Sequence, residues 1–280
     1  MDYDPTKTAL YHPELQPALL NADKKWTRHA ACAELSRLAY TRFEKGDPHL
    51  ADLKKTLHDA QFSSAQFFQN AATGTQAFAT TSKDGQSAFL VFRGTQTDDL
   101  SDIIKDGEFL PVTWGDRGKV HLGFLQAFQS IEAELDAWIS ACQASIIWIS
   151  GHSLGAALAT LAAAKYTKTH LVTFGSPRVG DGQFADAFIG RDVARYVDCS
   201  DLVSFLPPDS IFYKHLRGLH YIDKHGRIMP DMTAADILAD QTVAKAEYLI
   251  ESSWKLANVG FRSMADHAPI NYVRALLGEI

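Results

Sequence analysis

The feature that most constrains the fold of this chain is a short apolar segment that leads into a glycine–serine turn and an alanine-rich segment. Residues 145–150 read SIIWIS and residues 154–165 read LGAALATLAAAK. A short continuous apolar run is typical of a strand buried on both faces of a parallel sheet, and an alanine-rich run favours a helix. The two segments therefore predict a strand–turn–helix unit, which is the building block of α/β folds.

The rest of the chain alternates in the same way. Strand-like composition predicts strands at 66–70, 75–82, 87–92, 145–150, 170–174 and 193–198. Apolar residues at helical spacing predict helices at 26–42, 122–142, 154–165 and 183–189. Asp84-Gly85 is a strong hairpin signal between two of the strands. The alternation predicts one α/β domain with a mostly parallel central sheet and helices on both faces.

Composition excludes several classes of function. The 280 residues carry a net charge of -6, which disfavours nucleic acid as a partner. Cys32, Cys142 and Cys199 show no C-x-x-C spacing, so we expect neither a disulfide framework nor a metal site, and no cofactor. The apolar runs are too short for a transmembrane segment. The first residues lack the pattern of a secretory signal, so we expect a cytoplasmic protein unless a leader was removed.

The chemistry is concentrated in Gly151-His152-Ser153-Leu154-Gly155, which matches G-x-S-x-G. Between a strand and a helix, this motif predicts a nucleophile elbow, in which the serine stands on a tight, strained turn. The serine hydroxyl then lies at the helix N-terminus, whose partial positive charge favours a developing oxyanion. The backbone N–H of Leu154, which follows the serine, is the expected oxyanion donor. The alternative is a glycine-rich turn with a helix-capping serine.

A serine nucleophile needs a base and an orienting acid, which follow it along the chain in the order acid, then histidine. Asp198 and Asp201 are the two candidate acids. The candidate bases are His215, His220, His225 and His267. His152 is too close to Ser153 in sequence to reach its hydroxyl properly, and we expect it to pack or hydrogen-bond locally.

Five blocks along the chain resemble the class 3 lipase family, the fungal-lipase-like α/β-hydrolases. They occur in the family's order: FRGT at 92–95, VHLGF at 120–124, GHSLGAALA at 151–159, FGSPRVGD at 174–181 and DHAPINYV at 266–273. The resemblance implies the α/β-hydrolase fold for a single domain over 26–280. Residues 1–25 have no recognised counterpart and are treated as an N-terminal extension.

The resemblance also implies the site residues. The family's acid precedes two apolar residues and a nearby Leu-Pro-Pro, which selects Asp201 over Asp198. The setting of DHAPINYV selects His267 as the base, so Ser153, Asp201 and His267 form the expected catalytic triad. Thr95 in FRGT is the expected second oxyanion donor. Arg93 is expected to pair with Asp102 or another nearby acid.

A complete triad implies an ester hydrolase that works through an acyl-enzyme on Ser153. We expect a triacylglycerol lipase or carboxylesterase with an ester or lipid substrate, and the lipid–water interface as a further partner. Two alternatives stay open: an aryl esterase of the feruloyl kind, and a catalytically silent relative that binds a lipid or a protein. The full set of triad residues argues against the silent relative.

Two segments are candidates for covering the acyl site. Residues 96–112 occupy the family's lid position, and Leu100, Ile103 and Ile104 have the spacing of a short amphipathic helix. The segment is acidic and lacks the usual lid tryptophan. Residues 230–262 are rich in helix formers and form either a cap or a packed peripheral helix pair. The segment 96–112 is likewise either a lid or an ordinary surface helix.

Overall fold

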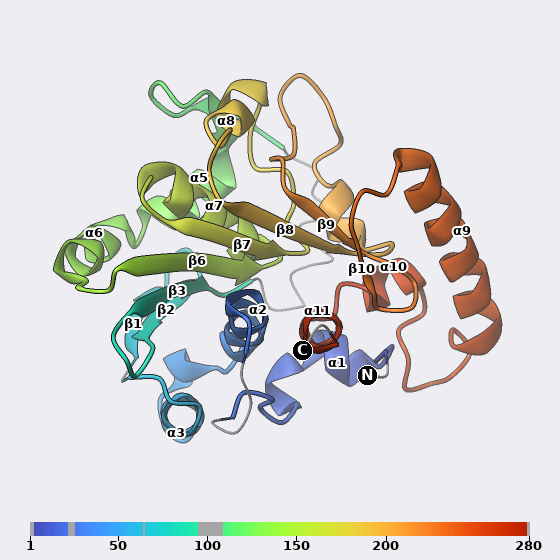
Figure 1. The fold of residues 1–280 in the computed structure, drawn as a ribbon, viewed down its shortest axis with the longest axis horizontal. Helices are drawn as coiled ribbons and strands as arrows, with labels where there is room; N and C mark the ends of the chain where they lie inside the picture. Colours follow the sequence, from blue (N-terminus) through green and yellow to red (C-terminus); the bar gives the residue numbers. More distant parts are fainter. Residues whose placement is uncertain (1–2, 22–25, 64, 95–108, 279–280) are drawn as a thin grey trace.

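The computed structural model describes residues 3–21, 26–63, 65–94 and 109–278, and its centre is an eight-stranded sheet (Figure 1). The strands lie in the order β1-β2-β3-β6-β7-β8-β9-β10. Their bounds are β1 (Gln66–Asn70), β2 (Thr75–Thr81), β3 (Ser87–Phe92), β6 (Ile146–His152), β7 (His170–Phe174), β8 (Val193–Asp198), β9 (Leu219–Ile222) and β10 (Ile228–Met229). A separate two-stranded sheet pairs β4 (Pro111–Thr113) with β5 (Lys119–His121).

The central strands β3, β6, β7, β8 and β9 run parallel, while β1, β2 and β10 add antiparallel pairs at the two edges. The mostly parallel α/β sheet predicted from sequence is thus confirmed. Strand β6 lies between β3 and β7, so the residues at its carboxyl end project from the middle of the sheet. This is the edge at which open α/β sheets hold their ligands.

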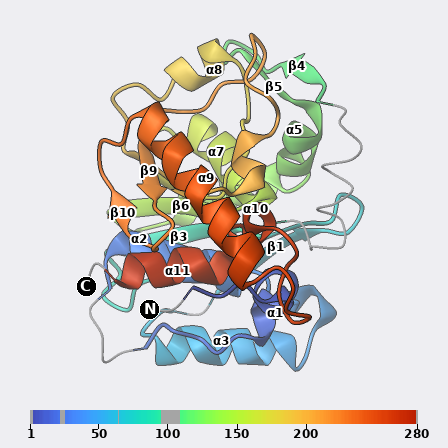
Figure 2. The same ribbon diagram turned by 90° about the vertical axis from the view of Figure 1, so that its right-hand side faces the viewer.

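Helices cover both faces of the sheet (Figures 1 and 2). On one face lie α2 (Arg28–Leu38) and α11 (Pro269–Leu277), and on the other lie α5 (Leu122–Gln129) and α7 (Leu154–Lys165). The other helices of the described residues are α1 (Lys7–Tyr11), α3 (His49–Asp59), α6 (Glu132–Ala141), α8 (Gly182–Asp186), α9 (Ala234–Glu251) and α10 (Arg262–Ala265). The same ranges also contain the short 3-10 helices η1 (Pro13–Leu15), η2 (Phe43–Lys45) and η3 (Leu202–Phe205).

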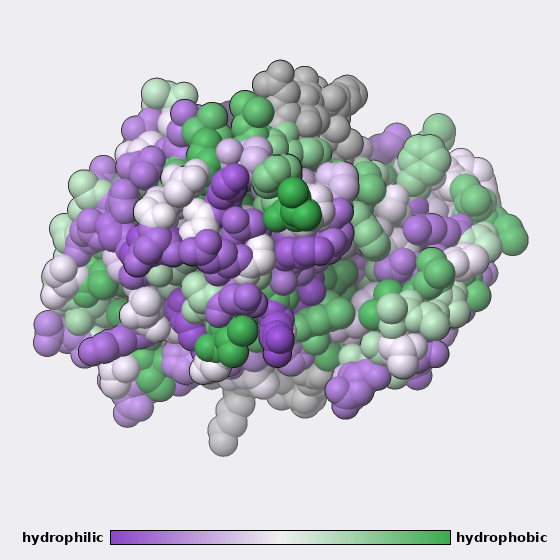
Figure 3. Space-filling model, turned by 90° about the horizontal axis from the view of Figure 1, so that it is seen from above, coloured by the Kyte–Doolittle hydropathy of each residue, from purple (hydrophilic) through white to green (hydrophobic). Residues whose placement is uncertain are grey.

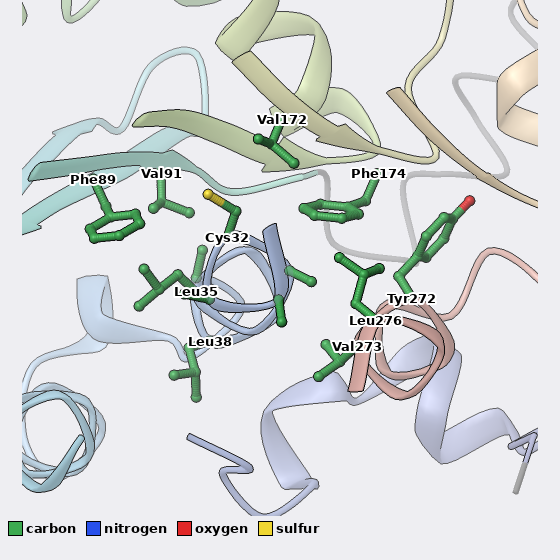
Figure 4. Close-up of a cluster of buried hydrophobic side chains, with 14 of the residues drawn as sticks. Cys32, Leu35, Leu38, Phe89, Val91, Val172, Phe174, Tyr272, Val273 and Leu276 are labelled. Carbon is green, nitrogen blue, oxygen red and sulfur yellow. The ribbon is translucent and has the colours of Figure 1, made fainter. Parts of the chain in front are cut away.

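Alternating side chains of the sheet build the core beneath α2 and α11 (Figure 4). Phe174 of β7 and Phe89 of β3 point toward Cys32 of α2 and Leu276 of α11, and all four side chains are buried. Burying side chains of this size contributes about 1.5–3 kcal/mol each. The core therefore fixes α11, and with it the residues that immediately precede this helix.

The single long helix predicted over 122–142 is wrong, because the chain breaks between α5 and α6 at Ser130 and Ile131. In a continuous helix, the carbonyl of Ala127 would accept from the N–H of Ile131. Here that carbonyl accepts from the Ser130 hydroxyl at 2.7 Å and from the Thr75 hydroxyl at 3.2 Å. The Asn70 amide also binds the Ser130 carbonyl at 3.3 Å. Side chains of the sheet edge therefore end the helix and leave Ile131 buried.

The described part of the N-terminal extension packs onto the body of the protein beside α11 (Figure 2). The Asp4 N–H donates to Asn271 of α11 at 2.8 Å, and the Tyr3 hydroxyl donates to Asp266 at 2.8 Å. The guanidinium of Arg37 on α2 donates to the carbonyl of Pro13 at 2.7 Å. Residues 3–21 are therefore bound to the two helices that cover one face of the sheet.

Within the described ranges, no helix combines the length and the apolar character needed to cross a bilayer.

Candidate active site

Ser153 occupies a strained turn between β6 and α7. Its backbone has φ 60° and ψ −130°, a conformation that non-glycine residues rarely adopt. A Cβ on Gly151 would lie 2.3 Å from the backbone of Gly155, and a Cβ on Gly155 would lie 2.3 Å from the carbonyl oxygen of Phe92. Both glycines are therefore required for α7 to approach β6 and β3 this closely, which explains the G-x-S-x-G spacing.

His267 lies two residues before the start of α11, and its imidazole contacts Ser153. Its Nε2 is 2.8 Å from the Ser153 hydroxyl oxygen. Its Nδ1 is 2.8 Å from Oδ2 and 2.9 Å from Oδ1 of Asp201. Nδ1–H therefore donates to the carboxylate, which leaves Nε2 to accept the serine proton. Three residues that the sequence predicts to act together are brought into one hydrogen-bonded chain.

Asp201 follows β8 and caps η3, so its carboxylate is held on several sides. It is fully buried, and it accepts from the Val203 N–H at 2.9 Å and from the Tyr272 hydroxyl at 2.5 Å. Burial and the charge of Asp201 raise the pKa of Tyr272 well above its ordinary value, so Tyr272 keeps the proton that it donates. A Cβ on Gly175 would lie 2.5 Å from Asp201 Oδ2, so only glycine fits beside this carboxylate.

His152, inside the elbow, positions the site through contacts that are distant in sequence rather than local. Its Nε2 lies 2.9 Å from the carbonyl oxygen of His267, and its Nδ1 lies 2.8 Å from the Tyr40 hydroxyl. Burial and the proximity of His267 lower the pKa of His152 well below its usual value, so the ring stays neutral. Nε2–H therefore donates to the carbonyl, and Nδ1 accepts from Tyr40. Both ring nitrogens have partners other than Ser153.

The other candidate acid and bases lie elsewhere. The backbone N–H of Asp198 donates to the Tyr272 hydroxyl at 3.1 Å, and burial together with the charge of Asp266 raises the pKa of the Asp198 carboxyl well above its usual range. His215 binds the carbonyl of Ser204 at 2.6 Å, while His220 stacks on Tyr196. His225 follows Asp223 in the turn between β9 and β10.

The oxyanion donors are only partly described by the structure. Leu154 is the first residue of α7 and follows Ser153 directly, so its N–H has no acceptor within the helix. Thr95 lies outside the described residues. Arg93, two residues before Thr95 in the chain, forms an ion pair with Glu44 of η2 at 2.8 Å. Asp102, the acid named as its expected partner, also lies outside the described residues.

Comparisons with known proteins agree with this geometry. The family model described as lipase (class 3) matches residues 89–211, which include the elbow and Asp201. The chain is 36% identical over 128 residues to a secreted mono- and diacylglycerol lipase of Fusarium solani, a match that covers 42% of this chain and 38% of that protein. It is 26% identical over 256 residues to the triacylglycerol lipase OBL1 of Ricinus communis, covering 69% of this chain and 49% of that protein.

Residues 89–211 thus match the class 3 lipase family, and the relatives found are named as lipases. The aligned region spans less than half the length of these curated relatives. Among solved structures, lipase II of Rhizopus niveus matches with a TM-score of 0.59 and 25% identity, covering 69% of this chain and 79% of that chain. A triacylglycerol lipase described as having a serine protease triad matches with the same TM-score and identity, over 78% of its chain. The fold is the α/β-hydrolase fold that these lipases share.

The family's lid position is only partly described. Residues 96–108 of the predicted lid 96–112 lie outside the described residues, as do Leu100, Ile103 and Ile104. The remainder leads into β4, and Phe109 packs edge-on against His121 and Tyr213 with ring centroids 6.1 and 6.4 Å apart. The lid role stays a prediction.

The predicted cap, residues 230–262, consists largely of α9. Thr233 and Asp236 form a capping box that begins the helix. Gln241 donates to the carbonyl of Cys199 at 2.8 Å, so α9 binds the loop that leads to Asp201. The helix lies on the same side of the molecule as β9 and β10 (Figures 1 and 2). Whether this segment covers an acyl chain stays a prediction.

Sequence reasoning missed Gly175, Tyr272 and Tyr40. Gly175 and Tyr272 lie within two of the blocks that carry the family resemblance, so the signal was present in FGSPRVGD and DHAPINYV. Tyr40 lies at the end of a predicted helix without any motif. A Cβ on Gly94 would lie 2.2 Å from the Tyr40 hydroxyl, so the chain passes tightly here as well.

Among the described residues, no cluster of His, Cys, Asp and Glu is arranged to hold a metal ion.

Proposed function

We propose that the protein is a serine hydrolase that cleaves carboxylic esters, with acylglycerols as its substrate class. The observation that carries the proposal is the continuous hydrogen-bonded chain from Ser153 through His267 to Asp201. A nucleophile, a base and an orienting acid at hydrogen-bond distance form the arrangement that activates a serine hydroxyl. Relatives named as lipases of mono-, di- and triacylglycerols support the choice of substrate.

The proposed reaction proceeds in two steps. Nε2 of His267 takes the proton from Ser153 as the serine oxygen attacks the ester carbonyl, and the alcohol leaves with that proton. Water, deprotonated by the same nitrogen, then releases the acid from the acyl-enzyme. Asp201 holds the ring orientation and stabilises its positive form. The N–H groups of Leu154 and Thr95 bind the oxyanion, and each such donor contributes about 3 kcal/mol to transition-state stabilisation.

We further propose that the enzyme works at a lipid–water interface, with residues 230–262 as the contacting cap. Large apolar side chains in this segment face solvent, and Figure 3 shows apolar surface gathered at the end of the molecule that α9 occupies. They are Leu249, Ile250, Trp254, Leu256 and Phe261. An exposed apolar cluster of this kind marks a site of interaction. In this proposal residues 26–280 form the catalytic domain, residues 96–112 its lid, and residues 1–25 an N-terminal extension whose Asp4 holds α11 through Asn271.

The test is the initial rate of hydrolysis of p-nitrophenyl esters from acetate to palmitate, below and above their solubility limits. We expect a rate that rises when an interface forms, and a fall of about 10³-fold or more in Ser153→Ala. The circular dichroism spectrum of the variant serves as the control for folding. Turnover retained in folded Ser153→Ala would show that Ser153 is not the nucleophile. A rate that simply saturates with the concentration of short soluble esters would contradict the interfacial part of the proposal and leave the ester hydrolase part standing.

A second pair of variants tests the base. We expect His267→Ala to lower the rate by orders of magnitude, because Nε2 is the group that takes the serine proton. His220→Ala is the matched control, since its ring stacks on Tyr196 outside the triad. The opposite ranking of the two variants would assign the base to the β9–β10 hairpin.

A further inference from the structure

A pocket of about 440 Å³ lies between one face of strands β8 and β9 and helix α9. Arg195 and Val197 of β8 and Tyr221 of β9 point into it from the sheet, because alternate residues of paired strands share a face. Leu238 of α9 and Phe205 of η3 line its rim. None of the three triad residues lines this pocket, so it is separate from the reacting serine.

Arg195 is a buried cation without a partner among the described residues. Its side chain is 8% exposed, and its Nε is buried without a hydrogen-bond acceptor. No described residue accepts a hydrogen bond from its guanidinium or forms an ion pair with it. Burial and the charge of Arg178 lower the pKa of Arg195 to about 10, so it remains charged at neutral pH. A buried charge in this state is unfavourable unless something pairs with it.

The other polar groups of the pocket leave this charge uncompensated. Arg178 uses Nη1 to hold the carbonyls of Phe205 and Pro207 at 2.7 and 2.8 Å, and its Nε forms only a long ion pair with the exposed Asp209, at 3.8 Å. Burial and the charge of Arg195 lower the pKa of His215 to about 3, so its ring is neutral. No Asp or Glu is found among the residues described as lining the pocket. The site is therefore positively charged.

Apart from Ser204 and Gln241, the remainder of the wall is mainly apolar, and several of its large side chains are exposed. Phe205 is 43% exposed, Leu219 is 45% exposed and Leu238 is 65% exposed. Ile237 completes this side of the pocket. Large apolar side chains beside a buried guanidinium fit a ligand that has one anionic end and one apolar end. The volume lies within the range of about 300–1,000 Å³ that is usual for small-molecule sites.

We propose that this pocket binds an amphipathic carboxylate, with its carboxyl group on Arg195 and Arg178 and its apolar chain along Phe205, Leu219 and Leu238. A guanidinium binds a carboxylate through two parallel hydrogen bonds, which supplies the missing partner of Arg195. The apolar chain covers side chains that otherwise face water. The site does not include Ser153, so it stands whether or not the protein hydrolyses esters.

Calorimetric titration of the Ser153→Ala protein with octanoate, 1-octanol and inorganic phosphate tests the assignment. We expect octanoate to bind at least about tenfold more tightly than the alcohol or phosphate, because only octanoate satisfies both ends of the pocket. Arg195→Met should weaken octanoate by at least about tenfold and leave the alcohol unchanged. Arg117→Met, which removes a half-exposed arginine beside Trp114, is the matched control and should change neither.

Leu238→Glu is a second test variant. Leu238 is exposed on α9, so this substitution does not disturb the core of the protein. Its added negative charge should weaken octanoate by at least about tenfold, whereas Leu238→Gln should have a smaller effect. Equal affinity for octanoate and octanol would overturn the proposal. So would octanoate binding that both Arg195→Met and Leu238→Glu leave unchanged. If phosphate bound as tightly as octanoate, the pocket would be a simple anion site, and the proposal of an amphipathic ligand would be overturned.

Discussion

Asp201 and Arg195 are both buried charges on the same stretch of chain, one after the end of β8 and the other within it, but their surroundings are opposite. The Asp201 carboxylate accepts hydrogen bonds from His267, Val203 and Tyr272. The Arg195 guanidinium has no hydrogen-bond acceptor among the described residues. The first site is completed by folding, and the second is left open to a ligand.

The difference separates two uses of a buried charge. A carboxylate whose acceptor positions are filled from within the chain is fixed in position before any substrate arrives, which is what an orienting group requires. A guanidinium that folding leaves unpaired destabilises the free protein and gains a partner only by binding one. The following predictions, in order of decreasing effect, test this contrast.

The largest effect is expected from removing the charge of Asp201. Asp201→Asn should lower kcat for p-nitrophenyl butyrate by about 10⁴-fold, because the amide no longer accepts from Nδ1–H of His267 and no longer stabilises its cation. Asp198→Asn is the matched control and should change kcat by less than about threefold. Burial and the charge of Asp266 raise the pKa of its carboxyl well above the usual range, and the carboxylate that binds His267 Nδ1 is that of Asp201. A larger loss in Asp198→Asn would reassign the acid.

An intermediate effect is expected from comparing two buried arginines. Arg37 pairs with Glu34 at 2.7 Å and both side chains are buried, so Arg37→Met should lower the free energy of unfolding by about 3–5 kcal/mol. Arg195→Met leaves no buried partner behind, so the free energy of unfolding should be unchanged or higher. Urea denaturation followed by circular dichroism measures both. Equal destabilisation by the two substitutions would show that Arg195 has a partner within the protein.

The smallest effect concerns the pH dependence of stability. Burial and the charge of Arg195 lower the pKa of His215 to about 3 in the folded protein. Between that value and about 6.5, its ordinary value, the unfolded state binds more protons, so stability falls as the pH decreases through this range. This group lowers the free energy of unfolding by about 1.4 kcal/mol for each pH unit of that range, and His215→Gln should abolish this part of the pH dependence. Denaturation at pH 7, 6 and 5 measures it, and parallel curves for both proteins would contradict the lowered pKa.

Sequence predicts the parts of this fold that depend on local patterns. Strands β1, β7 and β8 begin and end where apolar composition and turn residues place them. The helix over 122–142 was predicted as continuous because its apolar spacing continues through Ser130. Its break is caused by Thr75 and Asn70, which come from other parts of the chain. A pattern within the segment carries no information about such contacts.

The candidate site divides in the same way. Ser153 follows from the glycine spacing around it, and the choice of Asp201 and His267 came from the family resemblance. Tyr40 and Arg195 carry no local signal, because their roles depend on which groups lie beside them after folding. An arginine in a strand has the same appearance in sequence whether or not a carboxylate faces it.

The hydrogen bonds between Asp4 and Asn271 have a consequence for how the protein is made. They join residues 267 positions apart, and Asn271 belongs to the helix that begins two residues after His267. During synthesis, almost all of the sheet is available to fold before His267 has been added to the chain. Contacts of such long separation form late, because closing the intervening loop must come first. The elbow can thus be in place on the ribosome while His267, the proposed proton acceptor, is still missing, so under the proposed mechanism the nascent chain is inactive until α11 docks.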